Sequence, residues 1–168
     1  MTAYKFLASG AVGPFSGFRW PGPGAWVEVA GPLEPCRRGI HAPATDALSE
    51  WLSDELWNVE LAGELVRADG LVVAERGCLV DRVESWNAGA ALEFARACAE
   101  RLRERASADE RFVPFADDAE LQLELAADPK LTAVVAFIAR HAAEEAEPGG
   151  WAAERAWQSG LLAERLGL

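Results

Sequence analysis

Residues 57–83 decide the fold and read WNVELAGELVRADGLVVAERGCLVDRV. Trp57, Val59 and Leu61 alternate with polar residues, which is the pattern of a strand with one apolar and one polar face. Three further strand-like runs follow, at residues 64–67, 71–74 and 78–83. The Ala-Asp-Gly sequence at 68–70 favours a tight hairpin between two of these runs. Consecutive strands joined by tight turns predict an antiparallel meander rather than parallel βαβ units.

The N-terminal side of this segment carries shorter strand patterns. Apolar runs at residues 3–7, 26–29 and 39–42 lie between Gly- and Pro-containing stretches, which is typical of strands. Together with residues 57–83 they predict an antiparallel sheet of about five to seven strands, ending near residue 84.

The C-terminal side is helical. After Trp86 the apolar residues fall at helical spacing, as the stripe Ala91, Phe94, Ala95, Cys98 and Leu102 shows. We expect this amphipathic helix to cover one face of the sheet and residues 107–168 to continue as helices. The predicted fold class is therefore α+β, with a sheet domain at residues 1–106 and a helical C-terminal segment at residues 107–168 packed on it.

Charge and composition exclude several classes of function. The 168-residue chain has 16 basic and 27 acidic residues, a net charge of -11. A duplex nucleic-acid binder or a protein that docks on anionic membranes needs a basic face, so we expect neither partner. No apolar run approaches the roughly 20 residues of a membrane span. Three widely spaced cysteines and no export signal predict a cytoplasmic protein with reduced thiols.

No cofactor motif is present in the sequence. The two histidines, His41 and His141, are far apart, and no cysteine pair has metal-ligand spacing. The Gly-Pro-Gly at residues 22–24 is neither a phosphate loop nor a dinucleotide fingerprint, and no nucleophile elbow occurs. We therefore predict no metal and no bound cofactor.

The segment at residues 36–42, CRRGIHA, concentrates reactive side chains. Arg37 or Arg38 can hold a carboxylate or phosphate with a planar guanidinium, and nearby arginines stabilise a Cys36 thiolate. If Ile40 is in the core, His41 lies on the opposite face of its strand. The alternative is structural: Cys36 is a small buried hydrophobe, the arginines are solvated, and His41 is a polar residue on a half-exposed strand.

An aromatic loop at residues 13–24 is the second candidate feature. It carries Phe15, Phe18 and Trp20 among glycines and prolines, with Trp26 at the start of the strand that follows and Tyr4 nearby in the sequence. Such a group can stack a planar ligand or anchor a protein partner. Alternatively, the loop buries its own aromatics to fix an irregular backbone. The predicted ligand-binding residues from both features are Tyr4, Phe18, Arg19, Trp20, Trp26, Cys36, Arg37 and Arg38.

Two carboxylates form a third, weaker feature. Glu60 lies on the polar face of the strand that contains Trp57, and Glu64 opens the next run. A glutamate that faces a cleft can act as a general base or stabilise a developing cation. On an antiparallel sheet with one wet face, the same residue is often only solvated.

Several short segments together resemble an uncharacterised bacterial domain family in its actinobacterial members. They are YKF at 4–6, GFRW at 17–20, WVEV at 26–29, CRRGIHA at 36–42, WL at 51–52, ELWNVEL at 55–61 and VAERG at 73–77. More remote relatives of that family accompany pentapeptide repeats. The resemblance covers residues 4–106 and implies a shared fold, but no activity. A second resemblance is to ADP-ribosyltransferase folds, in which a strand like residues 39–42 precedes a helix and a later strand carries a catalytic glutamate.

These observations predict a non-catalytic binding or interaction domain whose partner is a small anionic ligand or a protein. Its site lies at the aromatic loop and the 36–42 segment. The alternative is an enzyme that transfers ADP-ribose from NAD through a cation at the ribose carbon. In that alternative His41 holds the ribose, Glu60 or Glu64 supplies the carboxylate, and Trp20 or Tyr4 stacks on nicotinamide.

Overall fold

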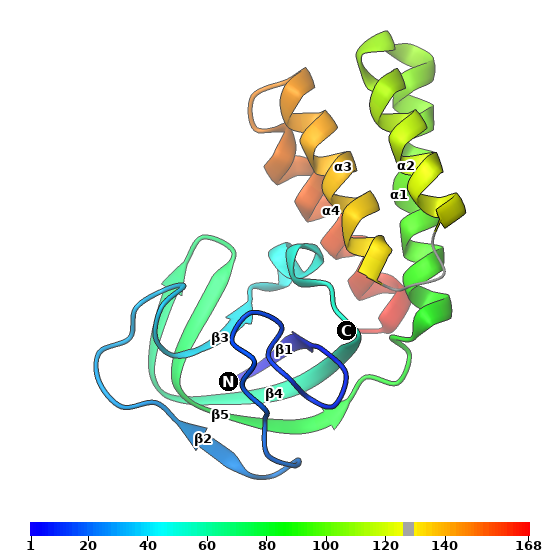
Figure 1. Cartoon of the computed structure of the whole chain (residues 1–168). Helices are drawn as coiled ribbons and strands as arrows, with labels where there is room; N and C mark the ends of the chain where they lie inside the picture. The colour runs from blue at the N-terminus through cyan, green and yellow to red at the C-terminus, as the bar shows by residue number, and fades with distance from the viewer. Residues whose placement is uncertain (126–129) are drawn as a thin grey trace. The chain divides into compact units, whose positions relative to one another are not determined.

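The computed structural model describes residues 1–125 and 130–168, and its contacts divide the chain into two compact units. The first unit, Met1–Glu84, contains an antiparallel sheet, and the second, Ser85–Leu168, contains α-helices (Figure 1). The predicted α+β class with an antiparallel sheet is confirmed. Within the described ranges no helix is both long and apolar enough to cross a membrane.

Five strands form the sheet. β4 (Glu55–Ala68) and β5 (Leu71–Arg82) are a long antiparallel hairpin, and β1 (Thr2–Leu7) pairs with the outer edge of β4. The other edge of β5 is shared: β3 (Ile40–Pro43) runs beside its first half and β2 (Trp26–Glu28) beside its second half. A 3-10 helix, η1 (Thr45–Trp51), connects β3 to β4.

The four strand-like runs expected at residues 57–83 are two long strands in the structure. The register of the hairpin shifts between Ala62 and Leu65, and Gly63 has φ +78°, so this glycine forms a bulge rather than a turn. Gly77 stays inside β5, paired with Leu61. Both glycines interrupt the alternation of the sequence without ending the strand, which is why a pattern-based reading divides β4 and β5.

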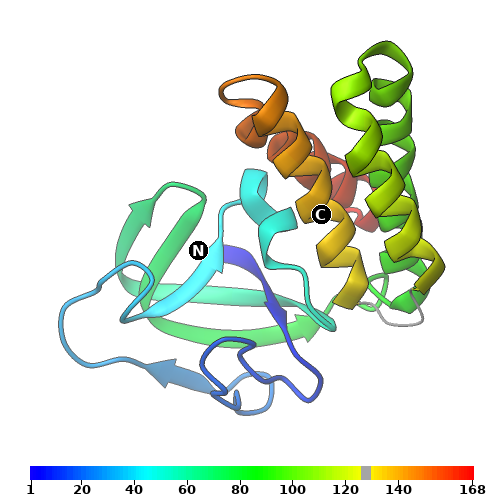
Figure 2. The ribbon, with the colours of Figure 1, turned by 45° about the horizontal axis from the view of Figure 1, so that its top comes forward.

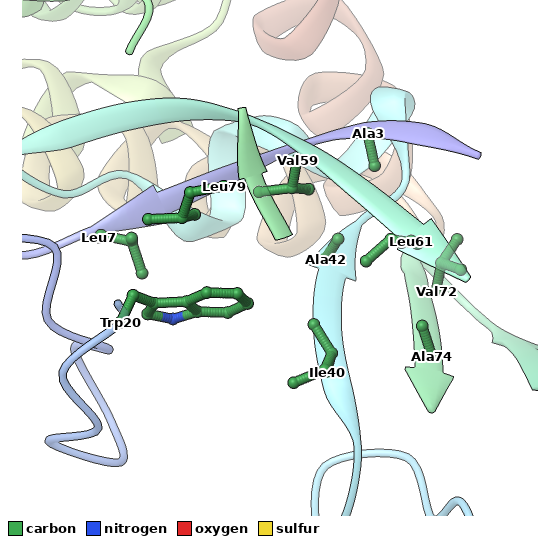
Figure 3. Close-up of a cluster of buried hydrophobic side chains, with 10 residues drawn as sticks. All are labelled: Ala3, Leu7, Trp20, Ile40, Ala42, Val59, Leu61, Val72, Ala74 and Leu79. Carbon is green, nitrogen blue, oxygen red and sulfur yellow. The ribbon is translucent and has the colours of Figure 1, made fainter. Parts of the chain in front are cut away.

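The sheet curls until its two ends meet. β1 and β3 lie side by side in both views (Figures 1 and 2), although β1 pairs only with β4 and β3 only with β5. The concave side holds a core in which the Trp20 ring lies beside Leu7 and Ile40 (Figure 3). The buried members of this core are Ala3, Leu7, Trp20, Ile40, Ala42, Val59, Leu61, Val72, Ala74 and Leu79.

The second unit contains α1 (Ala88–Ala108), α2 (Val113–Leu125), α3 (Lys130–Ala146) and α4 (Gly150–Leu166), with a short 3-10 helix η2 (Glu110–Phe112) before α2. Asn87 caps α1, because its side-chain oxygen accepts hydrogen bonds from the backbone N–H groups of Gly89 and Ala90 at 3.0 and 3.1 Å. The predicted apolar stripe of α1 is buried, and α1 contacts α2, α3 and α4.

Candidate functional site

A cavity of about 910 Å³ opens in the first unit. This volume lies within the range of roughly 300–1,000 Å³ that is usual for small-molecule sites. Five segments surround it: β1, the aromatic loop, β2 with the residues after it, the 36–41 segment and the end of η1. The lining residues are Lys5, Phe6, Gly13, Pro14, Phe15, Ser16, Phe18, Trp20, Val27, Glu28, Val29, Ala30, Cys36, Arg37, Gly39, Ile40, His41, Glu50 and Trp51.

Lys5 is a largely buried residue of the cavity lining. It stands between Ala3 and Leu7 in β1, so the alternation of the strand directs all three side chains to the apolar concave side. The side chain crosses from β1 to β3, where Nζ donates a hydrogen bond to the backbone carbonyl of His41. Nζ also lies 5.7 Å from the centroid of the Trp20 ring, a cation–π distance. Lys5 thus bridges the two ends of the sheet at the point where no backbone ladder joins them.

The surroundings of Lys5 disfavour its charged form. Burial lowers the pKa of the ammonium from 10.5 to about 8, and no nearby carboxylate offsets this effect. Two acidic side chains do line the cavity: Glu28, which forms an ion pair with Arg76 at 3.8 Å, and Glu50. Neither forms an ion pair with Lys5, nor does any other residue in the described part of the chain. The cavity therefore contains a half-buried cation that has no anionic partner among the described residues.

His41 is the second titratable group beside Lys5. Burial lowers the pKa of the imidazole, and the charge of Lys5 lowers it further, while backbone hydrogen bonds at Gly39 and Glu34 act in the opposite direction. The ring is therefore neutral at pH 7. Its Nε2 atom is buried and has no hydrogen-bond partner among residues 1–125 and 130–168.

The aromatic loop is attached to the sheet by two carboxylates at the start of β4. The backbone N–H groups of Gly10 and Ala11 donate to the Glu55 carboxylate at 2.9 and 3.1 Å. Asp54 accepts from the backbone N–H of Ser9 at 2.9 Å and from its Oγ at 2.8 Å. These contacts fix the turn from which the loop leaves β1, and so they position one wall of the cavity.

The aromatic side chains of this loop divide between core and cavity wall. Trp20 is only 6% exposed and belongs to the core, whereas Phe15 is 82% exposed. Phe15 packs edge-on against Trp51 with ring centroids 6.0 Å apart, and Phe18 packs edge-on against Trp20 at 5.9 Å. The burial of Trp20 agrees with the structural alternative for the loop, while Phe15 and Phe18 leave ring surface accessible. That the loop binds a ligand or a partner stays a prediction.

Cys36 occupies a tight turn at the rim. Its φ of +62° is in the left-handed region that favours glycine, and its side chain is exposed, so the alternative that it is a buried hydrophobe is wrong. Two backbone hydrogen bonds close the turn, from Glu34 N–H to the Arg38 carbonyl at 2.9 Å and from Arg38 N–H to the Glu34 carbonyl at 2.8 Å. Arg37 and Arg38 are exposed and lie 3.7 and 4.0 Å from the Glu34 carboxylate.

The structure brings some of the predicted site residues together and leaves others apart. Those that line the cavity are Phe18, Trp20, Cys36, Arg37 and His41. The predicted ligand-binding residues outside its lining are Tyr4, Arg19, Trp26 and Arg38. Trp26 instead packs beneath the guanidinium of Arg76, 5.0 Å from the ring centroid, and Arg19 donates to the Gly10 carbonyl at 3.2 Å.

Neither glutamate of the enzymatic alternative reaches the cavity. Glu60 is exposed in β4, opposite Thr2 and Cys78 on the neighbouring strands. Glu64 is exposed at the bulge of the hairpin, where its backbone N–H donates to the Glu75 carboxylate at 3.1 Å. Neither glutamate therefore joins His41 in the lining of this cavity.

The sequence reasoning missed Lys5, and also Glu28, Glu50 and Trp51. A signal for Lys5 exists, because it interrupts the apolar face of the strand at residues 3–7 in a chain that otherwise uses arginine almost throughout. No signal connects Glu28, Glu50 and Trp51 to the same site, since their approach depends on how the sheet curls.

No metal centre is evident, since the described residues contain no group of three or more His, Cys, Asp or Glu side chains able to hold an ion. Comparisons of the chain with protein-family models, with curated proteins and with solved structures find no match. The resemblance to the uncharacterised bacterial family therefore remains a prediction, and the cavity itself is the basis for a functional proposal.

Proposed function

We propose that the first unit is a binding domain for a small anionic ligand with a planar apolar part, and that Lys5 is the charge partner of the anion. The observation that carries this proposal is the half-buried ammonium of Lys5, which lacks a carboxylate partner and lines a ligand-sized cavity. Buried charges in proteins are normally paired. An anionic ligand would supply the missing pair.

The electrostatics of Lys5 give the anion a specific role. Burial of the ammonium costs free energy in the empty protein, and the lowered pKa measures that cost. A bound carboxylate, phosphate or sulfonate would favour the charged form and add a charge-assisted hydrogen bond. Arg37 at the rim is a second cation within reach of a larger ligand, although it already contacts Glu34.

The walls of the cavity favour a planar apolar group on the ligand. Phe15, Phe18 and Trp51 line it together with Trp20, and Phe15 is largely exposed. Aromatic rings offer both faces and edges to another ring, and stacked or edge-on pairs add to the gain from buried area. The exposed part of these rings is the surface that a flat ligand would cover.

The acidic character of the chain restricts the kind of anion. A net charge of -11 repels large polyanions, so the site must attract its ligand locally, through Lys5 and Arg37. This favours a small molecule over a polynucleotide. Cys36, Cys78 and Cys98 are free thiols, and we place the function in the reducing environment of the cytoplasm.

The two alternatives lack such an observation. ADP-ribosyl transfer would need His41 together with Glu60 or Glu64, and neither glutamate lines the cavity with His41. A protein partner would need a contiguous exposed surface whose shape and charge complement those of the partner. Two exposed rings of the first unit, Phe15 and Phe18, instead line a concave site of small-molecule size.

Binding of naphthalene derivatives tests the proposal. Naphthoate, naphthyl phosphate and naphthalene sulfonate each combine a planar ring system with an anion, and naphthamide is the matched neutral control. We expect at least one of the three anions to bind more tightly than naphthamide, in ligand-observed NMR and calorimetry. Lys5→Met should weaken that anion by about tenfold or more, corresponding to one lost charge-assisted contact, and leave naphthamide unchanged.

Two outcomes would contradict the proposal. One is that none of the three anions binds the wild-type protein. The other is that a bound anion has the same affinity for Lys5→Met as for wild type, which would place the ligand elsewhere. Arg67→Met is the matched control variant, because it also removes one cation from the first unit, at an exposed position outside the cavity lining.

A further inference from the structure

We propose that Lys5 is also a covalent attachment point: its amine condenses with an aldehyde group of the ligand to form an imine. This inference rests on the proposed function, since the same cavity would hold the ligand. A ligand that also carries an aldehyde would turn its anion toward Arg37, the other cation of the lining, so that the aldehyde and not the anion meets Lys5. The balance of the step is simple. The lone pair of Nζ forms a bond to the aldehyde carbon, the aldehyde oxygen leaves as water with the two hydrogens of the neutral amine, and a carbon–nitrogen double bond remains. No oxidant or reductant is needed.

The geometry of Lys5 suits a nucleophile. Lys5 extends from β1 into the cavity lining, and its Nζ donates one hydrogen bond, to the backbone carbonyl of His41. A neutral amine that donates one N–H to this carbonyl keeps its second N–H and its lone pair for the ligand. An ion pair would occupy the same positions and hold the amine protonated, and Lys5 forms none within the described residues.

Protonation is the usual obstacle to this chemistry, because an ordinary lysine is almost entirely an ammonium at neutral pH. The pKa of Lys5 is lowered to about 8 by burial. On the order of a tenth of the protein therefore carries a neutral amine near pH 7, compared with less than about a thousandth for a lysine of ordinary pKa. Desolvated lysines in apolar sites are activated nucleophiles for this reason.

The other groups around the cavity are compatible with an imine. The charged or titratable residues that line it besides Lys5 are Glu28, Arg37, His41 and Glu50, and Cys36 is a thiol at the rim. His41 is neutral at pH 7 and Glu28 is paired with Arg76, so neither holds Lys5 in its charged form. The ring of Trp20, 5.7 Å from Nζ, offers its face to a protonated imine as it does to the ammonium.

The sequence makes the modification easy to locate. The chain has two lysines, Lys5 and Lys130, so these and the N-terminal amine are the primary amines that an aldehyde can trap. The N-terminal ammonium donates to the Leu61 carbonyl at 2.8 Å. Peptide mapping of a single modified sample therefore compares Lys5 with two internal references and needs no variant.

The test uses a naphthoate that carries a formyl group on its second ring, with cyanoborohydride present to reduce any imine to a stable secondary amine. We expect Lys5 of the full-length protein to be modified near pH 7.5 at least about tenfold faster than Lys130. An α-amino group is also largely neutral at this pH, so the N-terminus is distinguished from Lys5 by competition, which should protect Lys5 alone. Lys5→Arg keeps a cation in the cavity and should lose the adduct. The hydroxymethyl analogue binds without reacting, so it should compete with the aldehyde and protect Lys5.

The outcomes separate this inference from the proposed function. If naphthoate and the hydroxymethyl analogue bind in a Lys5-dependent manner but Lys5 is modified no faster than Lys130, the imine is overturned and the binding function stands. If Lys5 reacts rapidly and the hydroxymethyl analogue gives no protection, the reaction does not occur in the ligand complex and the imine proposal is also overturned. If no anionic naphthalene binds and Lys5 shows no preference, both proposals fail.

Discussion

The buried ammonium of Lys5 lowers the free energy of unfolding, and the size of this effect depends on pH through the pKa of the side chain. The pKa of the ammonium is 10.5 in the unfolded chain and about 8 in the folded one. Between these values the unfolded state binds more protons, so stability rises with pH across this window. The cost is fully present below pH 8 and disappears above pH 10.5, and it is on the order of 3 kcal/mol. The other charged or titratable side chains that line the same cavity are Glu28, Arg37, His41 and Glu50. His41 is neutral and Glu28 pairs with Arg76, so neither offsets the destabilising effect of the Lys5 ammonium.

We therefore expect Lys5→Met to stabilise the protein at neutral pH. Methionine fills similar space without a charge, and the gain should be about 1–3 kcal/mol because the hydrogen bond to the His41 carbonyl is lost. Urea denaturation of wild type and variant at pH 7 and at pH 10.5 measures the effect. The difference should shrink toward the higher pH. A variant that is less stable than wild type at both pH values would show that the ammonium stabilises the fold, contrary to this argument.

Glu55 shows the opposite pH dependence. Burial alone would raise the pKa of this carboxyl, which is 8% exposed, but hydrogen bonds from the Trp57 indole and the Gly10 and Ala11 N–H groups lower it, with a further contribution from Arg82. The net pKa is lower than the usual value. Its contribution to stability is therefore present above pH 4.5 and is lost as pH falls through the folded pKa.

Replacing Glu55 by glutamine should destabilise the first unit and loosen the aromatic loop. The amide keeps the shape but brings N–H donors to a site where Gly10 and Ala11 also donate, so the loss should be about 1–3 kcal/mol at pH 7. Hydrogen exchange at the Gly10 and Ala11 amides should become faster, and naphthoate should bind more weakly. Wild type and variant should converge in acid, where Glu55 is protonated. Unchanged exchange at both amides would rule out this role for Glu55.

At the scale of single elements, the strand and helix patterns were largely predictable, and the bulges were not. The predicted strand at 26–29 is observed at Trp26–Glu28, the one at 39–42 at Ile40–Pro43, and the 68–70 turn joins β4 to β5. Local alternation contains this information. Whether Gly63 and Gly77 end a strand or lie within it depends on neighbours that are distant in sequence, since Gly77 packs against Ile40 and Trp20.

The candidate site was less predictable than the fold for the same reason. The aromatic loop and the 36–42 segment were located because each is a concentration of unusual residues in a short stretch. Lys5 was missed because a single lysine in a short strand reads as an exposed residue, and its burial follows from the meeting of β1 with β3. Contacts that arise from the curl of the sheet leave no periodic signal in the sequence.

Gly77 links the long hairpin to the cavity, which gives a prediction for β5. A Cβ atom at Gly77 would lie 2.7 Å from Cγ2 of Ile40 and 3.3 Å from Cη2 of Trp20, so Gly77→Ala must displace one or both. Overpacking of this kind costs about 1–3 kcal/mol. Because Trp20 and Ile40 line the cavity, naphthoate affinity should fall as well.

Gly22→Ala is the matched control for Gly77→Ala, because a Cβ at Gly22 meets nothing within 4 Å and its φ is not in the left-handed region. Urea denaturation and naphthoate titration of both variants complete the comparison. Equal stability of the two variants would contradict the close packing of β5 against Ile40 and Trp20.

At the scale of the whole molecule, each of the two units has its own buried core. The core of the curled sheet consists of residues between Ala3 and Leu79, and every residue that lines the cavity lies between Lys5 and Trp51. In the second unit, the buried stripe of α1 has its helical neighbours in α2, α3 and α4. The binding function that we propose is therefore complete within Met1–Glu84 as far as its lining residues are concerned.

This division leads to a prediction about fragments of the chain. If the compact unit Met1–Glu84 is sufficient, a fragment of these residues should fold by itself and bind naphthoate with the affinity of the full chain. If instead the sheet requires a helix to cover it, as the sequence pattern of residues 1–106 predicts, the shorter fragment should be unfolded and the 1–106 fragment folded. Dispersed amide NMR spectra and naphthoate titrations of both fragments distinguish the two cases. We expect the shorter fragment to fold, because the apolar concave side of its sheet already encloses Trp20 and Ile40. The longer fragment gains no such core, because it exposes the apolar stripe of α1 that α2 and α3 contact in the intact chain.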